Sequence, residues 1–251
     1  MNKKHAFTLM ELLVVTGIIA ILAMLVVAGM GSFQRKAAAA TALSNMRQLG
    51  TGIMTYATDH GDELPEEGES NPGWDTAGSE ENANAWYNAI PRLLGTKTVG
   101  EYSTDRAAFY SKRNLLFTPA AQYPADKTSR PYFAVSMNSK LRHGTAKDSP
   151  VRRGSIERAS KTVILQESGL PGEKAVRGQD RSKYDGQSKS YANRTVARYS
   201  GKTMAVFADG HAESLAAENV VSPDGQAYFP QSGPAGGDVY WTIDPDANAN
   251  D

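Results

Sequence analysis

The residue with the clearest chemical potential is one carboxylate in an apolar segment. Residues 7–30 read FTLMELLVVTGIIAILAMLVVAGM, and Glu11 is the only ionisable residue among them. An acid inside a membrane costs about 2.5–3.5 kcal/mol on insertion scales and is by default a functional candidate. Two interpretations stay open: Glu11 pairs with a cation, or its side chain reaches back to the membrane surface.

Other residues capable of chemistry are scattered. The chain has no cysteine, and its four histidines, His5, His60, His143 and His211, show no metal-ligand spacing. No nucleophile elbow, phosphate-binding glycine loop or dinucleotide motif is present. We therefore expect no enzymatic activity.

Two acidic runs are candidates for a calcium site, because hard oxygen ligands on loops suit that ion. They contain Asp59, Asp62, Glu63, Glu66 and Glu67, and Asp238, Asp244, Asp246 and Asp251. Neither run matches an EF-hand pattern, so solvated loops are the favoured interpretation. We expect no cofactor, with calcium in an acidic loop as the alternative.

The charge balance argues against a nucleic-acid partner. Lys+Arg and Asp+Glu both total 27, giving a net charge of zero. Basic residues near tyrosines are candidates for phosphate binding, but acidic residues interleave with them. This group comprises Arg142, His143, Arg152, Arg153, Arg177 and Arg181, with Tyr184 and Tyr191.

The apolar segment is long enough to cross a membrane. As a helix, its 24 residues would extend roughly 36 Å, against a hydrocarbon core of about 30 Å. A cleaved secretory signal ending at Val27-Ala28-Gly29 is one alternative, but its apolar core would be too long. A plain anchor is another, and it leaves Glu11 unexplained.

The residues Lys3-Lys4-His5-Ala6-Phe7-Thr8-Leu9-Met10-Glu11 resemble the processing site of type IV prepilins and type II secretion pseudopilins. The resemblance implies cleavage between Ala6 and Phe7 by a prepilin peptidase and methylation of the new amine on Phe7. The family usually has glycine where this chain has Ala6. The resemblance also places the N-terminus in the cytoplasm, the segment in the inner membrane and the remainder in the periplasm.

The resemblance further implies a structural subunit that is assembled into, or serves, a type IV pilus or a secretion pseudopilus. Its partners would be other pilin or pseudopilin subunits and an inner-membrane assembly platform. Cleavage would create a cationic amine on Phe7, and Glu11 of a neighbouring subunit could pair with it. The alternative function is a membrane-tethered head that binds a surface, DNA or a glycan and never polymerises.

The helix is expected to continue beyond the membrane to about Asp59. Apolar residues recur at spacings of three and four, which indicates one buried helical face. They are Leu43, Met46, Leu49, Ile53 and Tyr56, and Gly61 is a candidate C-terminal cap. The expected organisation is a leader (1–6), a transmembrane half-helix (7–30), an amphipathic half-helix (31–59) and a head (60–251).

The head is expected to be a loop-rich antiparallel sheet, so the fold class is α+β and pilin-like. Strands are predicted at 115–119, 132–138 and 162–165, a short helix around Trp86–Leu94, and loops over 59–84, 166–190 and 222–251. Asp209-Gly210, between two apolar runs, predicts a β-hairpin over 204–215.

This hairpin extends the resemblance to large-headed prepilin-like proteins common in Planctomycetes and Verrucomicrobia. That group carries a His, nine residues and then Asp-Gly. The present chain has the Asp209-Gly210 pair, with Tyr199 at the histidine position. It also has Thr118-Pro119 where the group often has Cys-Pro.

Overall fold

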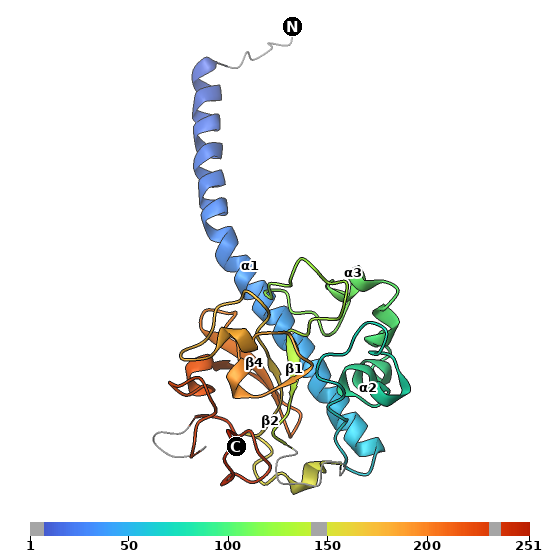
Figure 1. Ribbon diagram of the computed structural model, residues 1–251. Helices are drawn as coiled ribbons and strands as arrows, with labels where there is room; N and C mark the ends of the chain where they lie inside the picture. The colour runs from blue at the N-terminus through green and yellow to red at the C-terminus, as the bar shows by residue number, and fades with distance from the viewer. Residues whose placement is uncertain (1–7, 142–149, 231–236) are drawn as a thin grey trace.

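The computed structural model describes residues 8–141, 150–230 and 237–251. A long helix, α1, projects from an α+β head (Figure 1). It runs from Leu9 to Asp59, 51 residues, or about 77 Å. Gly61 ends it in a left-handed conformation with φ +64°, and the Asp62 N–H donates to the Ala57 carbonyl at 2.7 Å. The expected helix and its glycine cap are confirmed.

The head is built on one five-stranded sheet of order β3-β1-β2-β4-β5. Its strands are β1 (Val135–Asn138), β2 (Val163–Glu167), β3 (Lys189–Ser190), β4 (Lys202–Phe207) and β5 (Ala212–Ala216). All neighbours pair antiparallel except β1 and β3, which are parallel. The sheet is therefore mixed, not antiparallel throughout as expected. The long connection after β2 brings the chain back beside β1 in the same direction.

The remaining elements are short. The helices α2 and α3 span Trp86–Leu93 and Arg106–Phe109. Single 3₁₀ turns occur at Glu80–Asn82, Gly100–Tyr102, Arg153–Ser155, Arg181–Lys183, Ala192–Arg194 and Ala217–Asn219.

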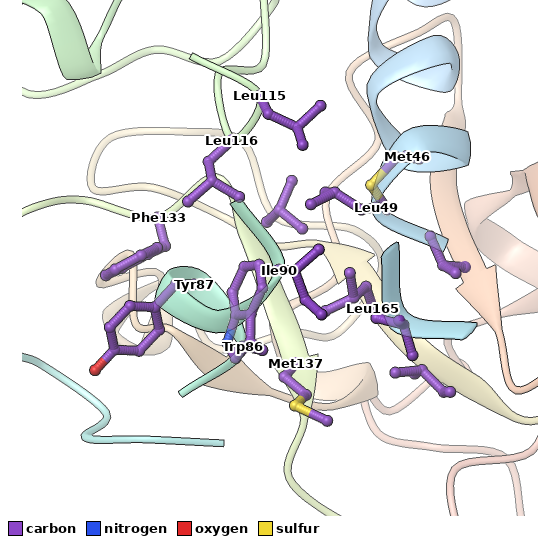
Figure 2. Close-up of a cluster of buried hydrophobic side chains, with 14 of the residues drawn as sticks. Met46, Leu49, Trp86, Tyr87, Ile90, Leu115, Leu116, Phe133, Met137 and Leu165 are labelled. Carbon is purple, nitrogen blue, oxygen red and sulfur yellow. The ribbon is translucent and has the colours of Figure 1, made fainter. Parts of the chain in front are cut away.

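The C-terminal half of α1 lies with α2 against one face of the sheet. Met46, Leu49 and Ile53 are at most 1% exposed, and Leu43 and Tyr56 are partly buried, so the predicted apolar face is confirmed. Figure 2 shows Met46 and Leu49 of α1 pointing toward Ile90 of α2 and Leu165 of the sheet. Burial of this stripe fixes the head on the helix.

The C-terminal part of the chain covers the opposite face. Along β4, Met204 and Val206 belong to the cluster on the α1 side, while Ala205 and Phe207 pack with Val221 and Trp241. Successive side chains of a strand point to opposite faces, so a strand covered on both sides is apolar throughout. This explains the uninterrupted apolar run 204–208.

The β4–β5 hairpin is confirmed, but its turn differs from the two-residue turn expected. The Phe207 N–H donates to the His211 carbonyl at 2.9 Å, which leaves a three-residue loop, Ala208 to Gly210. Gly210 has φ +90°, while Asp209 does not adopt a positive φ. Only the glycine therefore needs the left-handed region, as in hairpins that close with a bulge.

Four other predictions need correction. Residues 115–119 form turns rather than a strand, because the Asn114 side chain bonds the Phe109 carbonyl and the Leu116 N–H locally. The loop expected over 166–190 begins inside β2, which extends to Glu167, and ends with β3. The segment 59–84 is irregular, but it is not simply exposed, since Leu64 and Trp74 are buried in the main core. Where a strand was expected over 132–138, pairing begins at Val135.

Candidate membrane and assembly site

Glu11 lies in the first turn of α1 and closes the N-terminal end of that helix. Its Oε2 accepts hydrogen bonds from the Thr8 backbone N–H and the Thr8 hydroxyl, both at 2.8 Å. In return, the Glu11 N–H donates to Thr8 Oγ1 at 3.2 Å. This reciprocal pair is a capping box, in which a hydroxyl and an acid three residues later satisfy free N–H groups.

The capping box turns the carboxylate toward the start of the helix. Thr8 directly follows Phe7, so Glu11 bonds the residue next to the predicted new amine. Ala6 and Phe7 themselves lie outside the described residues. Sequence reasoning missed the role of Thr8, although the spacing Thr8-x-x-Glu11 is a known N-terminal signal.

The helix that follows presents apolar side chains to its surroundings. Every residue from Leu9 to Leu25 is exposed, including Leu9 at 83% and Ile21 at 62%. Among the described residues, α1 is the one helix long and apolar enough to cross a membrane, and its most apolar part contacts nothing in the head. Side chains of this kind are stable in lipid or against other apolar helices.

The hairpin meets the helix through two glycines. A Cβ added to Gly50 of α1 would lie 2.3 Å from the Gly210 carbonyl oxygen. A Cβ on Gly210 would lie 2.4 Å from Cγ of Met54. The Asp209-Gly210 turn therefore rests directly on the backbone of α1, at a distance that other residues would prevent.

On the β5 side of the turn, Asp209 holds His211 in place. Its Oδ1 accepts from the His211 N–H at 3.1 Å and lies 2.6 Å from His211 Nδ1. The His211 ring stacks on Phe207 with centroids 4.4 Å apart. The His211 side chain is 42% exposed.

The first acidic run is largely engaged with cations. Ion pairs join Asp62 to Arg153 at 2.8 Å, Glu63 to Arg152 at 3.5 Å and Glu67 to Lys189 at 3.4 Å. In the described part of the chain, no group of three or more His, Asp or Glu side chains is arranged to hold a metal ion. The described residues therefore provide no side-chain cluster that would support the calcium alternative.

Several of the basic and aromatic residues suggested for phosphate binding have partners within the head. Arg152 and Arg153 pair with acids, and Arg177 lies 3.7 Å from Glu218. Tyr184 is buried, and its hydroxyl bonds Gln179 and the Thr195 carbonyl. Arg142 and His143 lie outside the described residues.

A buried polar cluster in the head was not predicted. Arg198 lies between the carboxylates of Glu167 and Glu173, and all three side chains are at most 4% exposed. Tyr199, at the position where the resembled group has histidine, donates to Glu167 Oε1 at 3.1 Å. Residues separated by 25 or more positions give no spacing signal, so only the fold brings this cluster together.

The comparison with protein families decides how the N-terminus is interpreted. Residues 1–27 match the family model for the prokaryotic N-terminal methylation motif. The match marks a prepilin-type protein. Prepilin peptidase processes proteins that carry this motif, and such proteins assemble with other pilins; the N-terminus of the chain is similar to theirs, and the motif together with the apolar helix indicates a membrane anchor. Among curated proteins and among solved structures, nothing matches the chain.

Proposed function

We propose that this prepilin-type chain is a structural subunit that is cut between Ala6 and Phe7, methylated on Phe7 and assembled into, or used by, a type IV pilus or a type II secretion pseudopilus. The observation that carries the proposal is the division of α1. Its first part is apolar, exposed and matched by the methylation motif, while its second part is packed on the head. The role is structural rather than enzymatic.

In this proposal α1 crosses the inner membrane once, with its N-terminus in the cytoplasm and the head in the periplasm. The platform of the assembly machine would extract subunits whose exposed apolar faces then pack against one another. When a subunit moves from lipid to a position among other helices, these faces stay in apolar surroundings, so extraction does not expose them to water.

Glu11 has two possible partners in this scheme. Within its own chain it accepts hydrogen bonds from Thr8, the N-cap residue of α1. In a filament it could also accept a hydrogen bond from the methylated amine of a neighbouring Phe7. Opposite charges about 4 Å apart interact by about 4 kcal/mol at an effective dielectric constant of 20, before desolvation is deducted. A net gain of only about 1.4 kcal/mol would change the assembly constant tenfold.

Three variants separate these roles. Glu11→Ala removes both, Glu11→Gln keeps a hydrogen-bond acceptor without the charge, and Thr8→Ala removes the hydroxyl half of the capping box but keeps the charge. Leader cleavage, membrane level and recovery in sheared filaments would be measured for each.

We expect all three variants to be cleaved and inserted. Both Glu11 variants should be lost from filaments by about tenfold or more, whereas Thr8→Ala should be incorporated. If the Glu11→Gln variant enters filaments as efficiently as the chain that carries Glu11, the charge pair is refuted and Glu11 serves only its own helix. If the processed chain never appears in filaments, it is a tethered head instead.

A further inference from the structure

The buried cluster in the head contains two carboxylates and one cation. Arg198 binds Glu173 with two parallel hydrogen bonds, Nε to Oε1 at 2.9 Å and Nη2 to Oε2 at 2.6 Å. Its third nitrogen, Nη1, donates to the Ala134 carbonyl at 3.2 Å and lies 3.6 Å from Glu167 Oε1. The guanidinium therefore neutralises Glu173 and gives Glu167 only a longer contact.

Glu173 is held in its charged form. Besides Arg198, its carboxylate accepts the backbone N–H groups of Gln122 at 3.0 Å and Leu170 at 2.8 Å. Burial alone would raise the pKa of Glu173, but the Arg198 charge and these four hydrogen bonds hold it below its ordinary value.

Glu167 has neutral hydrogen-bond donors instead. Its side chain is fully buried and accepts from the Tyr199 hydroxyl at 3.1 Å and the Met204 N–H at 3.2 Å. Four titratable or charged groups face it in the described structure: Arg198 and Tyr199 before β4, Glu173 after β2, and Tyr123. With Glu167 ionised, the buried cluster of two carboxylates and one guanidinium would carry a net negative charge. Burial raises the pKa of Glu167 to about 7, and the negative charge of Glu173 acts in the same direction.

We propose that Glu167 is a buried proton-binding site that couples the stability of the head to pH. Glu167 joins the end of β2 to the start of β4 by accepting the hydrogen bonds from Tyr199 and Met204; these bonds and the Arg198 charge lower its pKa, but burial outweighs them. An ionised Glu167 leaves an excess charge in that junction. The proposal concerns the head alone and does not depend on whether the chain assembles.

The direction of the effect follows from proton binding. The pKa of Glu167 lies above its ordinary value of 4.5, so between these two values the folded head keeps a proton that the unfolded chain has lost. The stability contributed by the neutral acid is complete below pH 4.5 and is lost as pH rises to about 7. The unfolding constant should rise by up to about tenfold per pH unit in this window because of Glu167.

The test compares the full chain with its Glu167→Gln variant, which is neutral at every pH. Both would be unfolded with urea in detergent micelles at pH 5, 6, 7 and 8. Trp74, Trp86 and Trp241, all buried in the head, report unfolding by fluorescence. Relative to the variant, the unfolding constant of the unmodified chain should rise roughly 30–100-fold from pH 5 to pH 8. Parallel pH profiles would overturn the proposal.

A second variant tests the electrostatic cause. In Glu173→Gln the charge of Arg198 has only one carboxylate to neutralise, so the pH dependence assigned to Glu167 should shrink. Infrared spectra provide a readout that does not require Glu167→Gln to fold. The unmodified chain at pH 6 should show the carbonyl band of a protonated, buried carboxylic acid that disappears near neutral pH, and Glu173→Gln should show less of it. Absence of the band at pH 6 would refute the proton site.

Discussion

Replacing Gly50 with alanine tests how closely the hairpin approaches α1. In an ordinary helix, alanine in place of glycine stabilises by about 1 kcal/mol. At Gly50 the new Cβ would lie 2.3 Å from the Gly210 carbonyl oxygen and 3.0 Å from Val206 Cγ1. Both neighbours belong to the hairpin, so β4 or the turn must move away from the helix.

The higher helix propensity of alanine stabilises the chain and the close contact with the hairpin destabilises it, and the contact should have the larger effect on the free energy of unfolding. Overpacking in a close-packed interior costs about 1–3 kcal/mol, and the carbonyl oxygen is backbone rather than the flexible end of a side chain. From the middle of that range, about 2 kcal/mol, the helix gain of about 1 kcal/mol is deducted, so we expect Gly50→Ala to lower the free energy of unfolding of the head by about 1 kcal/mol.

The assay is urea unfolding of the full chain in detergent, followed by tryptophan fluorescence. Gly31→Ala is the matched control in the same helix, because its Cβ would meet only the Arg35 side chain, at 3.9 Å. This control should leave the unfolding midpoint of the head unchanged. If Gly50→Ala is as stable as Gly31→Ala, the close contact between the Asp209-Gly210 turn and α1 is refuted.

Two further predictions concern the head. Asn138 donates from Nδ2 to the carbonyls of Val163 at 2.7 Å and Trp241 at 2.8 Å, so Asn138→Ala should destabilise by about 1–3 kcal/mol and expose the C-terminal segment to proteolysis; an unchanged digestion rate would contradict this. A shortened chain beginning at Ser32 should be soluble, folded and monomeric, because contacts with the head start near Ala38. Size-exclusion chromatography in detergent-free buffer measures this, and aggregates would count against it.

The features that sequence alone predicted are those with a local signal. The α1 helix has a three- and four-residue apolar period that its packing reproduces at Met46, Leu49 and Ile53. The hairpin follows from an Asp-Gly pair between two apolar runs, and the fold confirms it with a longer turn. The capping box at Thr8 has a local signal too, Thr8-x-x-Glu11, although sequence reasoning missed it.

Other features depend on contacts between distant residues. Leu115 and Leu116 lie in a turn, and their side chains pack in the main core. An apolar run of this length does not distinguish a turn from a strand. Arg198 lies 25 residues from Glu173 and 31 from Glu167, so their grouping exists only after the sheet forms. The short strand β3 likewise depends on its pairing with β1, because two residues carry no period.

Processing of the chain as a prepilin can be measured by mass spectrometry of its N-terminal peptide from membranes of the native host. We expect a mature chain that begins at Phe7 and carries one methyl group on its amine, with residues 1–6 absent. A mature chain beginning at Met30 would identify an ordinary secretory signal, and an intact chain that retains residues 1–6 would identify a plain anchor; either result would refute prepilin processing.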